Sequence, residues 1–411
     1  MTKDTPGFRP PRQDDKPLWD VMFAVYGYPA LLIAHRLKVF SLLETRPHTL
    51  QEICKVLNIR RRPAEAILAA ATASGFLSLQ GGLYALTPLS EDYLLEKSPN
   101  YFGFFWDMMI DNAEVFSYVN LERAVLTDCP QAYGGGDIYR SHEDQAELAR
   151  RFTRGMHSIS MTLAFAWPNI ADLSNSRLML DIGGGSGAHS IGATLAFPQL
   201  RALVLDFQPI CEVAQEFIAK YGLQERVGIH VSDMWNDPFP SADLHFYSNI
   251  YHDWPMEKGA FLTQKSFASL ESGGRLIIHD VLYNDEKTGP FAAAAYSMLM
   301  MGWTEGESYS APEMAEMLGS AGFKEIRVHP AFGYYSIVSG IKPGLRLYAD
   351  THAGQSLPTS VYCQRRLDSI KEQLYEIQPA CFSIGPAFVH HGFGLGACPG
   401  GSRKKGTRTP G

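Results

Sequence analysis

Apolar residues recur at helical spacing through most of the first hundred residues. One such stripe is formed by Leu31, Leu32, His35, Val39 and Leu42. Thr49 and Glu52 have the spacing of a capping box at a helix start, and a further helix is predicted at 63–74. Two apolar segments at 76–79 and 83–86 flank the turn sequence Q-G-G, which favours a β-hairpin. Two short helices followed by a hairpin predict a winged-helix-like unit.

The pattern changes at about residue 177, where short apolar segments begin to alternate with helical ones. Strands are predicted at 178–182, 202–206, 227–231, 244–248 and 274–279, and helices at 186–197, 210–221 and 258–270. This alternation predicts βαβ units on a parallel sheet. Two closely spaced strands at 326–329 and 334–339 are expected to form an antiparallel pair at its edge. In residues 344–411 a helix is predicted at 361–377, but there is no core-forming pattern, and this predicts a poorly ordered extension.

Composition and charge exclude several classes of protein. The 411 residues are 45% hydrophobic and 19% charged, which is typical of a globular chain and excludes a largely disordered or coiled-coil protein. The net charge of −7 provides no overall basic field for binding nucleic acid or an anionic membrane.

The sequence shows no features of a secreted or membrane-spanning protein. Residues 1–16 are polar and Pro-rich, unlike a signal peptide. The longest apolar stretch, 21–34, has about 14 residues and contains Pro29, whereas a spanning helix needs roughly 20. The six cysteines are scattered without C-x-x-C pairs and indicate neither a zinc site nor a disulfide framework. A cytoplasmic protein without a metal is therefore expected.

A glycine-rich segment carries the strongest chemical signal. The sequence D-I-G-G-G-S-G at 181–187 follows an apolar strand and precedes a helix. Its glycines allow a tight turn and the close approach of a ligand to the helix N-terminus. Asp206 ends the next strand, where an acid can accept hydrogen bonds from two ribose hydroxyls. Both features indicate a nucleotide-like cofactor, and by themselves they fit a dinucleotide equally well.

Residues after the later strands discriminate between cofactors. Asp233 and Met234 follow the third strand, where an acid can bind an adenine amino group and a methionine can pack on the ring. His252 follows the fourth strand and should point into the ligand crevice, where its pKa near 6.5 suits a general base. Asp253 fits the position of a helix N-cap. Asp280 ends the fifth strand and can hold the imidazole of His252 in one tautomer.

The order of these motifs makes the chain resemble a known enzyme family. D-x-G-G-G-x-G, a ribose acid, D-M, H-D-W and L-x-x-G-G occur together in the S-adenosylmethionine-dependent small-molecule O-methyltransferases, and the resemblance covers residues 17–342. It implies an α/β fold with a Rossmann-like class I methyltransferase sheet and a mostly α N-terminal winged-helix dimerisation domain. The expected domains are a tail at 1–16, the dimerisation domain at 17–105, a helical linker and lid at 106–172, the catalytic domain at 173–343 and an extension at 344–411.

The resemblance also implies a set of site residues. His252 would be the catalytic base and Asp280 its first acid partner. The segment F-T-R-G-M-H-S-I-S at 152–160 resembles a family helix in which Met156 would face the acceptor and Ser160 the cofactor carboxylate. The cofactor contacts implied are Ser160, Asp181, Gly183, Gly185, Asp206, Asp233 and Met234. The residues expected at the acceptor site are Met156, Met298 and Trp303, with Trp106 and Met109.

The chain departs from the family pattern at two places. Ser248 and Asn249 stand where many members have Lys or Arg, and Ser248 is kept as a cofactor-binding candidate. The family often has a second acid partner of the histidine before a late helix. Here Glu307 is the candidate for that catalytic role, although an ungapped reading puts Ser308 at the position.

The expected reaction is transfer of a methyl group from S-adenosylmethionine to a phenolic or hydroxyindole-like hydroxyl. The implied partners are a small hydroxylated acceptor and a second copy of the chain, without nucleic acid or membrane. One alternative is an NAD-dependent oxidoreductase, which the glycine loop alone would allow. Another is a winged-helix ligand-sensing regulator that uses Arg60, Arg61 and Arg62, but residues 38–98 carry seven Lys/Arg against six Asp/Glu, a weak field for DNA.

Overall fold

A computed structural model describes residues 11–132 and 145–344 of the chain. Most of the predicted tail at 1–16 lies outside the described residues. All of the extension at 344–411 except its first residue, including the helix expected at 361–377, also lies outside them.

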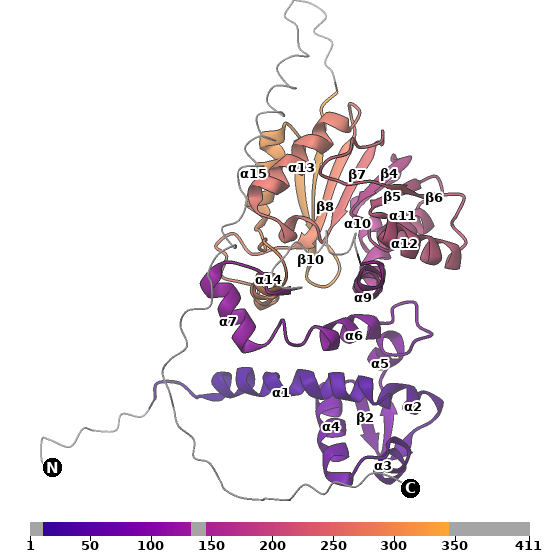
Figure 1. The fold of residues 1–411 in the computed structure, drawn as a ribbon, viewed down its shortest axis with the longest axis vertical. Helices are drawn as coiled ribbons and strands as arrows, with labels where there is room; N and C mark the ends of the chain where they lie inside the picture. Colours follow the sequence, from indigo (N-terminus) through magenta and orange to yellow (C-terminus); the bar gives the residue numbers. More distant parts are fainter. Residues whose placement is uncertain (1–10, 133–144, 345–411) are drawn as a thin grey trace, which may run out of the picture. The chain divides into compact units, whose positions relative to one another are not determined.

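The N-terminal part has the predicted helices and hairpin (Figure 1). Its elements are α1 (Lys16–Arg36), α2 (Val39–Thr45), β1 (His48–Thr49), α3 (Leu50–Leu57), α4 (Arg61–Ala73), β2 (Leu77–Gln80), β3 (Leu83–Leu86) and α5 (Pro88–Tyr93). The predicted capping box is present, since the Glu52 amide donates to Thr49 Oγ1 at 3.3 Å and the Thr49 amide donates to Glu52 Oε2 at 2.7 Å. The three strands form one antiparallel sheet in the order β1-β3-β2.

A helical segment connects this part to the second sheet. It comprises α6 (Gly103–Asp111), α7 (Tyr118–Thr127), α9 (Ala146–Ala164) and α10 (Trp167–Ala171). Helix α6 contributes Trp106 to the N-terminal core, where the side chain is 5% exposed. The same helix packs on α9 at Gly155, where an added Cβ would lie 3.0 Å from Met108 Sδ. Helix α6 thus joins the N-terminal core to α9.

The remainder of the described chain contains a seven-stranded sheet, whose strand order is β6-β5-β4-β7-β8-β10-β9. Its strands are β4 (Leu178–Ile182), β5 (Arg201–Asp206), β6 (Val227–Val231), β7 (Leu244–Ser248), β8 (Arg275–Val281), β9 (Lys324–Pro330) and β10 (Tyr335–Ile341). The strands β4 to β8 are parallel, and β9 and β10 are antiparallel as predicted. The order reverses between β4 and β7, so the ligand crevice is expected at their carboxyl ends.

Helices cover both faces of this sheet (Figure 1). The covering helices are α11 (Ala188–Ala196), α12 (Gln208–Lys220), α13 (Met256–Ser269) and α15 (Ala311–Ala321). Helix α14 (Phe291–Trp303) instead packs on α7 and on a short 3₁₀ turn, η2 (Tyr251–Asp253). The buried core between layers includes Met179, Ile191, Val204, Val213, Phe246 and Ile277. This is the predicted α/β architecture, with the glycine-rich segment at the start of α11.

Candidate active site

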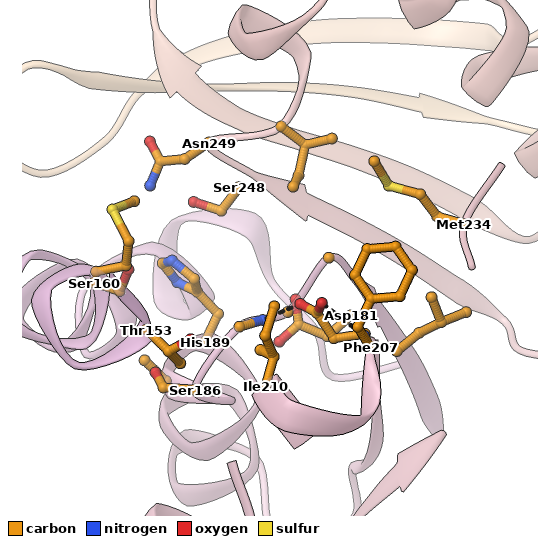
Figure 2. A pocket seen from close by; sticks show the side chains of 18 of the residues that line it. Thr153, Ser160, Asp181, Ser186, His189, Phe207, Ile210, Met234, Ser248 and Asn249 are labelled. Atoms are coloured by element: carbon orange, nitrogen blue, oxygen red, sulfur yellow. Dashed lines mark hydrogen bonds between the residues drawn. The ribbon is translucent and has the colours of Figure 1, made fainter. Parts of the chain in front are cut away.

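A cavity lies at the carboxyl ends of β4, β5 and β7, and the glycine-rich segment forms part of its lining. Figure 2 shows side chains that line it, among them Asp181, Met234 and Ser248. Gly183 and Gly185 have φ values of +65° and +57°, a region that favours glycine. A Cβ at Gly183 would also lie 2.5 Å from Ile250 Cδ1, so the Ile250 side chain would have to move to admit one. The predicted residues that line this cavity are Met156, Ser160, Asp181, Gly183, Gly185, Asp206, Met234 and Ser248.

Two carboxyl groups lie in this cavity. Asp206 Oδ2 accepts from the Gly185 amide at 3.0 Å and its Oδ1 from the Phe207 amide at 2.8 Å, while burial raises its pKa to about 6. Asp181 is 1% exposed and accepts from Ser190 Oγ at 2.7 Å, and burial raises its pKa to about 7. Buried carboxylates without a cation favour a ligand that brings hydroxyl donors or positive charge.

Asp233 differs in position from the other predicted cofactor residues, since it does not line this cavity. Its Oδ1 accepts from the Trp235 amide at 2.8 Å and its Oδ2 from Asn236 Nδ2 at 2.7 Å. These bonds shape the turn that carries Met234 and Trp235, and both of those residues do line the cavity.

A second cavity adjoins the first and is mostly apolar. Its lining comprises Phe105, Met108, Met109, Phe116, Phe152, Met156, Ile159, Asn249, His252, Asp253, Tyr296, Leu299, Met300 and Trp303. Phe152, Met156 and Asn249 line both cavities. Of the predicted acceptor residues, Met156, Met109 and Trp303 are therefore at the site. Met298 is 45% exposed and outside it, and Trp106 lies in the N-terminal core.

His252 lies on the wall of the second cavity, in η2, and is 2% exposed. Its Nδ1 is 2.6 Å from Asp280 Oδ1, which also accepts from the Val281 amide at 2.8 Å. The Nδ1–H group therefore donates to Asp280, which leaves Nε2 as the basic nitrogen. Although burial opposes the charged form, the carboxylates of Asp280 and Asp253 prevail and raise the pKa of His252 to about 9.

The second acid near His252 is Asp253, whose Oδ1 is 3.6 Å from Nε2. Helix α13 begins at Met256 with Pro255 at the cap position, so Asp253 is not the helix cap that its sequence position suggested. Glu307 is exposed, with an Oε2 that lies 3.5 Å from Lys287 Nζ. Ser308 is buried and donates to the Ala293 carbonyl at 3.4 Å. The structure brings neither Glu307 nor Ser308 to the imidazole.

Two tyrosines close to His252 and Asn249 were not predicted from the sequence. Tyr296 Oη lies 3.4 Å from His252 Nε2, and the two rings are perpendicular. Tyr335 Oη donates to Asn249 Oδ1 at 2.9 Å. Burial raises the pKa of Tyr296 well above 10, so its hydroxyl remains a proton donor. These tyrosines lie 44 and 83 residues beyond His252 and carry no local motif that could have identified them.

Comparisons with known proteins agree with this geometry. The family model described as an O-methyltransferase domain matches residues 118–324. The 3-hydroxy-5-methyl-1-naphthoate 3-O-methyltransferase of Streptomyces sahachiroi is 31% identical, over 79% of this chain and 94% of that protein. Acetylserotonin O-methyltransferase of Gallus gallus is 28% identical, over 76% and 93%. The crystal structure of human N-acetylserotonin methyltransferase with SAM has the same fold (TM-score 0.71, 22% identity, covering 82% of this chain and 100% of that one). The chain therefore belongs to the family of S-adenosylmethionine-dependent O-methyltransferases.

Proposed function

We propose that the chain methylates a phenolic or hydroxyindole-like hydroxyl of a small aromatic acceptor, with His252 as the general base. One observation carries this proposal: the basic Nε2 of His252 belongs to an aromatic- and Met-lined cavity that shares a wall with the cofactor cavity. Two relatives are named for the methylation of a hydroxynaphthoate and of acetylserotonin. Others are named as a tyrosine C(3)-methyltransferase and an N,N-dimethyltransferase, so the names of the relatives alone do not identify the acceptor atom. The basic nitrogen of His252 can accept the proton of a hydroxyl, and this supports oxygen as the acceptor atom here.

The residues that line the first cavity suit the chemical groups of S-adenosylmethionine. Asp206 suits the ribose hydroxyls and Met234 the adenine face, while Asp181 lies where a positive charge would offset its burial. Gly183, Gly185, Ser160 and Ser248 line the same cavity, and Asp233 would act by holding the Met234 turn. When bound, the cofactor supplies an electrophilic methyl group.

His252 would accept the proton of the acceptor hydroxyl at Nε2. Asp280 orients the ring through Nδ1 at 2.6 Å and stabilises the imidazolium that forms. General-base help of this type typically contributes about 10²–10⁴-fold, and holding two substrates in near-attack geometry contributes up to about 7–11 kcal/mol. The walls shared by the two cavities, Phe152 and Met156, would supply that positioning.

The proposed function is tested by calorimetric titration with S-adenosylhomocysteine and, in parallel, with NADH. Binding of the first alone, followed by transfer of labelled methyl groups to phenols or hydroxyindoles, is the expected result. Binding of NADH alone would instead support the oxidoreductase. Transfer only to amines or carbon acids would overturn the hydroxyl acceptor.

The pH dependence of catalysis should follow His252. Because the imidazole must be neutral to accept a proton and its pKa is raised to about 9, kcat/KM should rise with pH up to about 9. In Asp280→Asn the carboxylate that raises this pKa is lost, so the inflection should move toward lower pH. Both enzymes would be measured with the same acceptor, so that ionisation of the acceptor affects the two profiles equally. A profile that does not move in Asp280→Asn would contradict the assignment.

We also propose that α1 is covered by a second copy of the chain. Its exposed apolar side chains are Leu18, Trp19, Val21, Met22, Phe23, Val25, Tyr26, Tyr28 and Ile33. Among the described helices, α1 alone has the length and apolar content to cross a membrane. However, its last turns place Leu31, Ala34 and His35 in the N-terminal domain, so the helix cannot run its full length through lipid. A cytoplasmic homodimer without nucleic-acid or membrane partners is the assembly proposed.

Charge on the exposed face of α1 should dissociate this dimer. Val21 and Val25 are 69% and 65% exposed and lie one helical turn apart. The double variant Val21→Glu/Val25→Glu is expected to sediment as a monomer, because the interface would have to bury two unpaired carboxylates. Val328→Glu, at an exposed position of the edge strand β9, is the matched control and should remain dimeric. A wild-type chain that is monomeric at micromolar concentration would refute the proposal.

A further inference from the structure

His189 is a buried histidine whose ring nitrogens have no partner within the described part of the chain. It is 5% exposed, lies in the first turn of α11 and lines the cofactor cavity. Neither Nδ1 nor Nε2 makes a hydrogen bond to the described residues. Buried polar groups are almost always hydrogen-bonded, because leaving one unsatisfied is costly. An imidazole that faces a ligand cavity is therefore expected to bond to the ligand.

The surroundings of His189 keep it neutral. Its ring centroid lies 5.2 Å from that of Phe246, 5.3 Å from that of His279 and 6.4 Å from that of Trp167. Burial in this aromatic cluster lowers the pKa of His189 to about 3. A neutral imidazole carries one N–H donor and one acceptor nitrogen. His189 can therefore donate a hydrogen bond without bringing a charge.

The lining of the cavity makes such a donor useful. Among the described residues that line it there are two carboxyl groups, Asp181 and Asp206, but no Lys or Arg. The amino-acid end of S-adenosylmethionine carries a carboxylate, which must then be bound by neutral donors. The positive N-terminal end of α11, where His189 lies, favours an anion.

The position of His189 in the cavity indicates which end of the cofactor it meets. Asp206 and Met234 mark the nucleoside end, and the wall at Met156 and Asn249 leads to the acceptor cavity. His189 extends toward the side on which Ser160 and Ser248 lie (Figure 2). This side is left for the amino-acid end.

We propose that His189 binds the carboxylate of the amino-acid end of S-adenosylmethionine through a ring N–H group. The proposal rests on the proposed function and adds a residue to its cofactor site. His189 is a positioning residue here: by fixing the amino-acid end, it fixes where the neighbouring methyl group lies relative to His252.

The test compares three ligands on His189→Phe, which keeps an aromatic ring of similar size and removes both nitrogens. S-adenosylhomocysteine has the complete amino-acid end, its decarboxylated analogue keeps only the amine, and 5′-methylthioadenosine lacks both. A lost hydrogen bond to a charged group corresponds to about 10–100-fold in affinity. His189→Phe should weaken S-adenosylhomocysteine by this factor in calorimetry and leave the other two unchanged.

Other outcomes would overturn the proposal. Equal weakening of all three ligands would assign His189 a structural role in the aromatic cluster. Unchanged affinity for S-adenosylhomocysteine would remove the contact. If the decarboxylated analogue weakens as well and only methylthioadenosine does not, the amine rather than the carboxylate is the partner. His189→Asn keeps an N–H donor and should recover part of the affinity for S-adenosylhomocysteine. It is also the control that separates loss of the hydrogen bond from a folding defect in His189→Phe. Failure of the proposed function would look different, since the wild-type chain would then bind no S-adenosylhomocysteine.

Discussion

Replacing His252 by alanine should lower turnover by about 10²–10⁴-fold, the usual contribution of a positioned general base. The reason is geometric: Nδ1 is held by Asp280 at 2.6 Å, and Nε2 is the basic atom of the acceptor cavity. The first cavity does not include His252, so the affinity for S-adenosylhomocysteine should remain that of the wild type. Turnover at saturating acceptor and calorimetric affinity together test this prediction.

The matched control for this variant is His329→Ala, because His329 is an exposed histidine on β9. It should keep full turnover. Removing His252 also leaves a buried carboxylate without its partner, which destabilises a protein, so the melting temperature of each variant must be measured with its activity. A His252→Ala enzyme that is folded and turns over at the wild-type rate would remove His252 from the mechanism.

Gly306→Ala should lower turnover, although Gly306 lines neither the cofactor cavity nor the acceptor cavity. A Cβ at Gly306 would overlap the backbone of η2, at the His252 carbonyl oxygen, the Asp253 carbonyl carbon and the Trp254 amide nitrogen. Backbone cannot rotate away as a side chain can, so either this segment or η2 must shift. Overpacking of this kind costs about 1–3 kcal/mol of unfolding free energy. A displacement of about 1 Å at the catalytic histidine can cost about 10²-fold in turnover.

The neighbouring residue Glu307 supplies the control for Gly306→Ala and tests the candidate second acid at once. Its side chain is exposed, so Glu307→Ala should change the unfolding free energy by no more than about 0.5 kcal/mol. Turnover should also be unchanged, since Asp253 is the second carboxylate near His252. Urea denaturation and kcat would be measured for both variants. A large loss of turnover in Glu307→Ala would restore its catalytic role, and a fully active Gly306→Ala would refute the packing argument.

Much of the fold could be predicted because local patterns determine it. The capping box at Thr49 and the hairpin around Gly81 need only neighbouring residues, and the βαβ alternation follows from repeated short apolar segments. The glycine segment and the acids at strand ends were also predictable, because the carboxyl ends of parallel strands converge on one crevice. His252 and Asp280 meet for this reason.

The acceptor cavity was harder to predict, because its residues depend on which face each helix presents. Helix α14 is apolar on nearly all sides, so its pattern does not reveal the buried face. Tyr296, Leu299, Met300 and Trp303 share the face that lines the cavity, whereas Met298 points elsewhere and is exposed. Contacts such as Tyr335 with Asn249 join residues 86 apart and follow from the register of β10, which no local motif encodes.

The strand order has a consequence for the way the chain acquires its structure during synthesis. Strand β10 lies between β8 and β9, although it is made after both. Until β10 has left the ribosome, β9 has no partner in the sheet and β8 has a free edge. The bond from Tyr335 to Asn249 likewise waits for this strand. The catalytic half of the sheet is therefore completed last, and a nascent chain shorter than about 341 residues carries an exposed strand edge that is prone to association.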